Sequence, residues 1–190
     1  MYIYKAERVF SQTPVGCNRK ATMTQQIFYF DKLTSWDKIT INGYLILTGI
    51  LTYFFLRINS DSSNRTLLLF YTLGTQLLLY LLNYVSLRNL SVFLIWLMFS
   101  FGHLYLYYQL KDNPSLQNFR GLAATGLRNT IISLFLFQLL RLISIKTQRK
   151  ELVAPNKGGR TDIYEGRKIT IVDYVLFVVY FGTTIYLNFL

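Results

Sequence analysis

Long apolar segments separated by short polar ones dominate this chain. Four of them contain almost no charged residue: 39–56, 66–87, 89–110 and 174–190, the last of which lengthens if it begins at Ile171. An α-helix rises about 1.5 Å per residue, so about 20 residues cross the roughly 30 Å hydrocarbon core of a bilayer. The pattern therefore predicts transmembrane helices at these four positions.

A fifth apolar segment, residues 121–145, contains two arginines. Only 12 consecutive residues between Arg128 and Arg141 are uncharged. We still count this segment as a span, because an arginine near the membrane boundary can extend its guanidinium to the headgroups. The expected fold is an all-α, polytopic transmembrane helical bundle with about five spans. Spans 2 and 3, separated only by Arg88, are expected to form a tight hairpin.

The distribution of Lys and Arg supports five spans. With five, 15 of the 20 basic residues fall on the side of the N-terminus and five on the other side. Leaving out the first or the fourth span makes the distribution more even. Since an excess of basic residues marks the cytosolic side, we expect an integral membrane protein with a cytosolic N-terminus and its C-terminus on the opposite side.

The pattern also divides the chain into a tail and a membrane domain. Residues 1–34 are predicted to form a polar basic cytosolic tail, in which Met1 and Met23 are both open as start sites. Residues 35–190 form the transmembrane helical domain, with a cytosolic loop at 146–169 that contains helix-breaking proline and glycine.

Two segments carry a signature of helix N-termini. Residues 34–37 (TSWD) and 170–173 (TIVD) both have a threonine followed three positions later by an aspartate. In this pattern the two side chains satisfy backbone N–H groups that the first turn of a helix leaves unpaired. The sequence therefore predicts helices that begin just after Thr34 and Thr170.

Composition agrees with a membrane protein. Only 15% of residues are charged, and the mean hydropathy is +0.30, whereas soluble domains are about one quarter charged. The net charge is +11, but the basic residues fall between apolar segments, so nucleic acid is not an expected partner. A single cysteine and a single histidine fit no metal-binding spacing, and we predict neither a metal site nor a cofactor.

Polar residues at membrane depth are the strongest candidates for a functional site. An antiparallel hairpin places Thr72 opposite His103, and the residues that share this region form a predicted intramembrane polar cluster: Thr72, Gln76, Asn83, Ser100 and His103. Hydrogen bonds between helices are one role for such a cluster, and a proton or ion path or a cofactor site is the other. Ser100 and His103 could also touch as a nucleophile and base, although no oxyanion hole or orienting group accompanies them.

A second candidate lies at the cytosolic boundary. Arg141 and Asp173 fall at similar depth and could form an ion pair. Alternatively, Arg141 contacts lipid phosphate and Asp173 only begins the last helix. Basic residues of the following loop form a predicted cytosolic basic surface: Lys146, Arg149, Lys150, Lys157, Arg160, Arg167 and Lys168.

These features favour a role in contacts over a role in catalysis. The common catalytic motifs are missing from the sequence, and the basic surface suits anionic headgroups on the cytosolic side or a protein partner. We therefore expect an integral membrane accessory, assembly or small effector subunit that acts through a larger partner or a homo-oligomer. A small oligomeric channel or transporter lined by Gln76, Asn83, Ser100 and His103 is the first alternative, and an intramembrane enzyme is the second.

Overall fold

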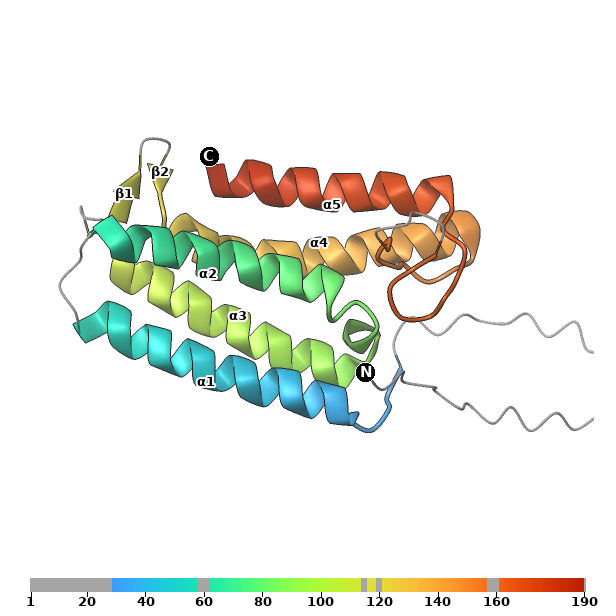
Figure 1. Cartoon of the computed structure of the whole chain (residues 1–190), viewed down its shortest axis with the longest axis horizontal. Coiled ribbons are helices and arrows are strands. Elements are labelled where there is room, and N and C mark those ends of the chain that lie inside the picture. Colours follow the sequence, from blue (N-terminus) through green and yellow to red (C-terminus); the bar gives the residue numbers. More distant parts are fainter. Residues whose placement is uncertain (1–28, 58–61, 114–115, 119–120, 157–160, 190) are drawn as a thin grey trace, which may run out of the picture.

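Five α-helices make up the fold in the computed structural model, which describes residues 29–57, 62–113, 116–118, 121–156 and 161–189 (Figure 1). The helices are α1 (Ser35–Arg57), α2 (Ser62–Leu81), α3 (Leu90–Leu110), α4 (Thr125–Gln148) and α5 (Ile171–Phe189). A short 3-10 helix, η1 (Ser86–Arg88), lies between α2 and α3, and the two-residue strands β1 (Gln117–Asn118) and β2 (Gly121–Leu122) pair before α4. The predicted all-α helical bundle is confirmed.

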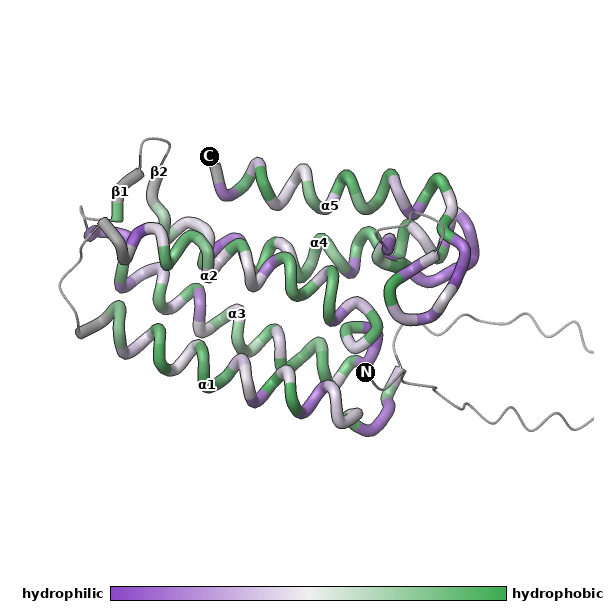
Figure 2. The backbone as a smooth tube through the Cα atoms, viewed as in Figure 1, coloured by the Kyte–Doolittle hydropathy of each residue, from purple (hydrophilic) through white to green (hydrophobic). Residues whose placement is uncertain are grey.

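Length and apolar composition identify an integral membrane protein. Among the described residues, four helical stretches are long and apolar enough to cross a membrane: Ser35–Phe55, Leu90–Leu110, Thr125–Gln148 and Ile171–Asn188. The helix α2 runs alongside them but begins with five polar residues, which makes it less apolar. Figure 2 shows that hydrophobic residues predominate along the helices, whereas the connection between α4 and α5 is largely hydrophilic.

The central element of the bundle is α4. It packs against α3, α5 and α2, whereas α1 lies at the edge and packs on α3. Of the described side chains of α1, only Asp37, Tyr44 and Phe55 are fully buried. Leu51 and Phe54 pack partly buried against the core. Most other apolar side chains of α1 are exposed, as expected of a helix that faces lipid: Ile39, Leu45, Ile46, Leu47, Ile50 and Tyr53.

A single outward row of α4 marks how this helix crosses the membrane. Positions three or four apart on a helix share one face, and the exposed ones of α4 run from a cation through apolar residues to a second cation: Arg128, Ile132, Phe135, Leu139, Ile143 and Lys146. Lys150 is exposed as well and lies just beyond the end of the helix at Gln148. Arg128 and Lys146 are separated by about 27 Å along the axis, at 1.5 Å per residue. This distance is close to the roughly 30 Å thickness of the hydrocarbon core. The helix therefore matches the bilayer although it contains two arginines.

Both predicted helix starts have the expected side-chain bonds. At the start of α1, Thr34 donates its N–H and its hydroxyl to Asp37 at 2.8 and 2.7 Å, and the N–H of Asp37 donates to the Thr34 hydroxyl at 3.2 Å. Thr170 and Asp173 repeat the same three bonds at the start of α5, at 2.9, 2.8 and 3.2 Å. These bonds explain why the helices begin at Ser35 and Ile171.

The connection between α2 and α3 differs from the predicted hairpin. The second span was expected to continue to residue 87, but α2 ends at Leu81, and an eight-residue turn leads to α3. The N–H groups of Leu82 and Asn83 both donate to the carbonyl of Leu78, at 3.0 and 3.1 Å, so the helix widens and stops. Asn83 therefore lies after the helix and outside its face.

Candidate functional site

A hydrogen-bonded cluster surrounds the only histidine, in the middle of the bundle. Nε2 of His103 lies 2.7 Å from the hydroxyl of Tyr71 and 2.9 Å from that of Tyr44, and Nδ1 lies 3.1 Å from the hydroxyl of Thr130. The two tyrosine hydroxyls are 3.2 Å apart. The imidazole is fully buried. These four residues come from α3, α2, α1 and α4, so one side chain connects four of the five helices.

The donors and acceptors of this cluster can all be matched within the protein. A neutral imidazole has one donor nitrogen and one acceptor nitrogen. If Nδ1 carries the proton, it donates to Thr130, whose hydroxyl reaches the carbonyl of Gly126 at 3.4 Å, and Nε2 accepts from Tyr71. Thr48 lies 2.8 Å from the Tyr71 hydroxyl and extends the chain of bonds. The arrangement is suited to fixing the helices, because each ring nitrogen already has a partner.

The residues of the predicted intramembrane cluster do not form one hydrogen-bonded group around His103. Thr72 and Gln76 face α4 and α5: Gln76 donates to the carbonyl of Gly126 at 2.9 Å and its side-chain oxygen accepts from Asn188. Ser100 donates to the carbonyl of Leu97 in its own helix at 2.7 Å, and not to His103. The residue of α2 that meets His103 is Tyr71, one position before the predicted Thr72.

Loss of the imidazole should weaken the bundle measurably. His103→Leu leaves the hydroxyls of Tyr44, Tyr71 and Thr130 without their common partner. Because interhelical hydrogen bonds in membranes contribute about 0.6 kcal/mol each on average, we expect a loss of about 1–2 kcal/mol in the free energy of unfolding. An unfolding titration in mixed micelles measures it.

Ser100→Ala is the matched control for this substitution. It lies one turn away on the same helix, is equally buried, and loses only a bond to its own backbone. Its free energy of unfolding should stay within about 0.5 kcal/mol of the unsubstituted value. Equal losses in both variants would show that His103 does not connect the helices.

A second polar centre lies at the end of the bundle where α4 meets α5. We call the connection between these helices, described for residues 149–156 and 161–170, the cap. Leu152, Val153 and Ala154 are fully buried in it. The cap therefore packs as part of the core, at the same end of the bundle as η1 (Figure 1).

Two arginines of the bundle bind glutamates of the cap. Arg141 contacts both carboxylate oxygens of Glu151, at 2.7 and 2.9 Å, and its side chain is 1% exposed. Arg88 contacts both oxygens of Glu165, at 2.6 and 3.2 Å, and approaches Glu151 to 3.7 Å. Tyr29 donates to Glu151 at 3.4 Å. Bidentate pairs of this kind fix geometry as well as charge, so they hold the cap against α4 and the η1 turn.

The predicted ion pair between Arg141 and Asp173 is wrong, because each residue pairs with a different one. Asp173 accepts from Arg167 at 2.7 Å and from Gln148 at 2.8 Å, in addition to its bonds with Thr170. Arg141 turns instead to Glu151, ten residues further along the chain. The reason is the folded cap, which brings a carboxylate closer to Arg141 than the start of α5 does.

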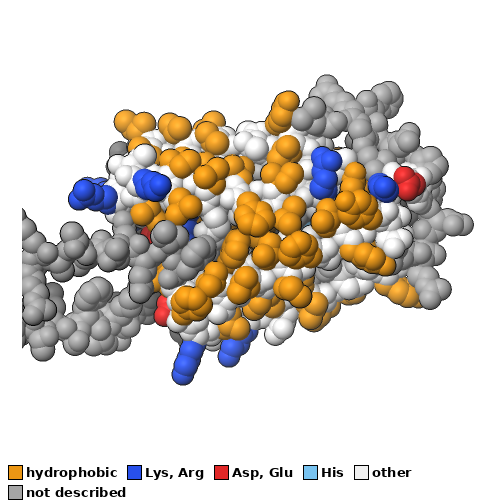
Figure 3. Space-filling view, turned by 180° about the vertical axis from the view of Figure 1, so that it is seen from behind, with side chains coloured by type: hydrophobic (Ala, Val, Ile, Leu, Met, Phe, Trp, Pro, Cys, Tyr) orange, Lys and Arg blue, Asp and Glu red, His pale blue; other side chains and the backbone are white. Residues whose placement is uncertain are grey.

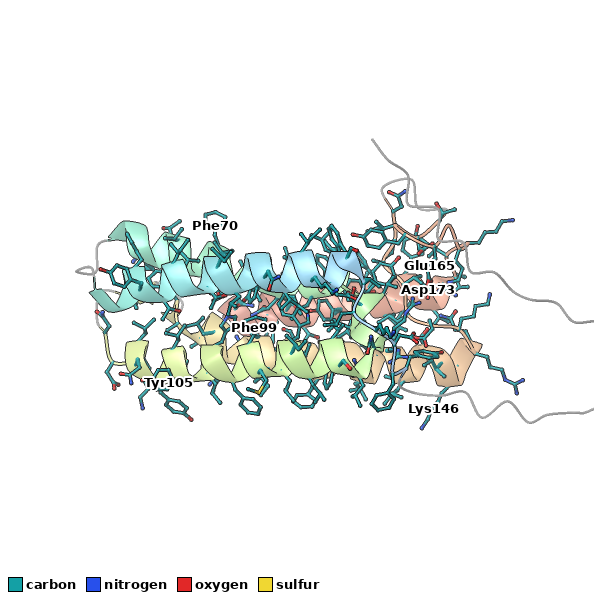
Figure 4. All side chains as sticks on the ribbon, turned by 90° about the horizontal axis from the view of Figure 1, so that it is seen from below. Phe70, Phe99, Tyr105, Lys146, Glu165 and Asp173 are labelled. Atoms are coloured by element: carbon teal, nitrogen blue, oxygen red, sulfur yellow. The ribbon has the colours of Figure 1, made fainter. Side chains whose placement is uncertain are left out.

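Asp162 organises the turn in the cap. It accepts from the hydroxyl of Tyr84 at 2.6 Å and from the N–H groups of Glu165 and Arg167 at 2.9 and 2.6 Å. Burial raises the pKa of the Tyr84 hydroxyl, and the hydrogen bond to the Asp162 carboxylate raises it further. Tyr84 therefore remains protonated and acts as a donor. Figure 4 shows Glu165 and Asp173 among the side chains gathered at this end.

The predicted basic surface is only partly an outward surface. Lys146, Arg149, Lys150 and Lys168 are exposed, whereas Arg167 is half-buried against Asp173. Lys157 and Arg160 lie outside the described residues. Within the described part of the chain, no group of three His, Cys, Asp or Glu side chains is arranged to hold a metal ion.

Several residues of these two centres were not found from the sequence. Tyr44, Tyr71 and Thr130 around His103, and Arg88, Glu151 and Glu165 at the cap, belong to no recognisable motif. For the cap there was one usable signal, because Arg88 is the only charge between two apolar spans and needs a carboxylate when buried. Comparisons of the chain with protein-family models, curated proteins and solved structures found no match.

Proposed function

We propose that this protein is an integral membrane accessory or assembly subunit that binds a larger protein partner through the outer surface of its cap. The observation that carries this proposal is the construction of the cap. Two helices of a bundle need about 2–8 residues to connect them, and much longer ordered connections usually have a function of their own. Here the connection is longer, has a buried core and is fixed by three arginine–carboxylate pairs.

The outer surface of the cap has the composition of a protein interface. Ile163 and Tyr164 are 38% and 48% exposed beyond the membrane-spanning helices, and Lys168 is exposed near them in sequence. Exposed aromatic and aliphatic side chains outside lipid are typical of contact sites, in which tyrosine is enriched. The excess of basic residues at this end favours a cytosolic location for the cap and the N-terminus.

The polar interior supports the same proposal over a channel. Gln76, Asn83, Ser100 and His103 were the expected lining of a pore, but Asn83 lies beyond α2 and Ser100 donates to the backbone of its own helix. Gln76 and His103 each use their side chains in bonds between helices, and both bond to α4. If the purified protein in liposomes conducts ions, and Gln76→Leu abolishes the current, the channel alternative replaces our proposal. We expect no flux above that of empty liposomes.

A pair of double variants tests the partner proposal directly. Tyr164→Ala with Lys168→Glu changes the outer surface of the cap, and Tyr108→Ala with Lys111→Glu makes the same replacements at the opposite end of the bundle, where Tyr108 is 58% exposed. Native electrophoresis of membranes solubilised in mild detergent compares the complexes.

We expect the original protein and the control to migrate as one stoichiometric complex, and the cap variant to migrate alone at the same abundance. A complex that survives the cap substitutions, or an original protein that migrates alone, contradicts the proposal.

A further inference from the structure

The outward row of α4 has an apolar part and a basic end. Phe135, Leu139 and Ile143 are 53%, 54% and 38% exposed, and Lys146 continues the row in the last turn of α4. Lys150 is also exposed and follows just after the helix ends at Gln148. Figure 3 shows hydrophobic side chains spread over the middle of one face of the molecule, with Lys and Arg side chains toward both ends. In Figure 4, Lys146 points outward from α4, away from Glu165 and Asp173.

The charge at this place is not balanced by the nearby acids. Glu151 follows Lys150 directly, but its carboxylate is bound by Arg141 and approached by Arg88. Asp173 is fully buried and bound by Arg167. The two lysines therefore keep a net positive field at the membrane boundary, where the backbone of Lys150 is held by a bond from Ser144 at 2.9 Å.

The apolar part of the row has the length of one leaflet. From Lys146 to Phe135 the distance along the axis is about 16 Å at 1.5 Å per residue, which is about half of the roughly 30 Å hydrocarbon core. Phe135 also packs edge-on against Phe93 of α3, with ring centroids 6.3 Å apart, so the row adjoins a neighbouring helix and does not stand alone.

We propose that this row binds an anionic phospholipid, with the phosphate at Lys146 and Lys150 and an acyl chain along Ile143, Leu139 and Phe135. A zwitterionic lipid has the same acyl chains but no net charge, so the lysines confer the preference for anionic headgroups. The site lies on the lipid-facing side of α4 and at the first residues of the cap. It does not include Tyr164 or Lys168 and does not depend on the proposed partner of the cap.

Thermal unfolding in detergent with added lipid tests the site. We expect phosphatidylglycerol to raise the unfolding midpoint more than phosphatidylcholine with the same acyl chains. A basic residue near a charged membrane surface contributes about fivefold to binding, so Lys146→Gln with Lys150→Gln should raise the half-saturating concentration of phosphatidylglycerol about 25-fold.

The matched control is Lys32→Gln with Lys38→Gln. Both lysines are exposed at the same end of the bundle, near the start of α1, and removing them lowers the net charge equally. We expect the control to change the half-saturating concentration less than twofold, and soluble glycerol phosphate to leave the midpoint unchanged. Equal effects of the two double variants, equal effects of the two lipids, or a shift with glycerol phosphate would overturn the proposal.

Discussion

Among the residues whose ion pairs hold the cap, Arg141 should give the most destabilising single substitution. We expect Arg141→Ala to lower the free energy of unfolding by about 3 kcal/mol. The guanidinium is buried and makes two bonds to Glu151 and a weaker one to Gln138, at 3.4 Å. Removing it leaves a carboxylate that is only 19% exposed without its closest cation. Breaking a buried pair from one side typically costs 3–5 kcal/mol, and we expect the lower value because Arg88 still approaches Glu151.

Two further variants separate the ion pair from a general effect of truncation. Lys146→Ala shortens an exposed cation on the same helix and should change the stability by less than about 0.5 kcal/mol. Removing both Arg141 and Glu151 should cost at least about 1 kcal/mol less than the sum of the single losses, because the second removal leaves no unpaired charge. Additive losses, measured by unfolding titrations in mixed micelles, would show that the two side chains do not act as a pair.

The sequence predicted best those features that depend on neighbouring residues. The helix starts at Thr34 and Thr170 need only two side chains three positions apart, and both have the expected hydrogen bonds. A helix at α4 that is long and apolar enough to cross the membrane was predicted despite its arginines. The uncharged stretch and the position of Arg128 near its end are local properties. The same reasoning predicted Thr72 as the residue of α2 opposite His103, and the observed partner is its neighbour Tyr71.

The end of α2 could not be predicted in the same way. No proline or glycine lies between Leu81 and the start of α3, and residues 82–87 carry no charge. The helix stops because distant groups bind the turn: Tyr84 donates to Asp162, and Gln138 donates to the carbonyl of Leu87 at 2.9 Å. The end of α2 is therefore determined by contacts between residues more than 50 positions apart, and not by the local helical pattern.

The choice of partner for Arg141 has the same origin. If the spans are treated as straight helices, Asp173 lies at the same depth as Arg141. The folded cap instead places Glu151 against α4, 2.7 Å from the Arg141 guanidinium. A long polar connection was expected to be an irregular loop in water. Its three buried residues, Leu152 to Ala154, instead make it part of the bundle and give both glutamates fixed positions.

Gly126→Ala should destabilise the protein by about 1–3 kcal/mol, the usual cost of excess volume in a packed interior. A methyl group at Gly126 would overlap the hydroxyl of Thr72 and lie 2.7 Å from both Thr72 Cβ and Asn188 Oδ1. The side chain of Thr72 is short and branched, so α2 and α4 must separate, which also stretches the bond from Gln76 to the Gly126 carbonyl. Gly102→Ala is the matched control, because the added methyl group has no described atom within 4 Å apart from its chain neighbours and the adjacent backbone of its own helix. In that exposed helical position alanine should be neutral or stabilise by up to about 1 kcal/mol. In mixed micelles the Gly126→Ala variant should therefore be less stable than the Gly102→Ala variant by at least about 1 kcal/mol. Equal unfolding free energies of the two variants would contradict close contact of α2, α4 and α5 at Gly126.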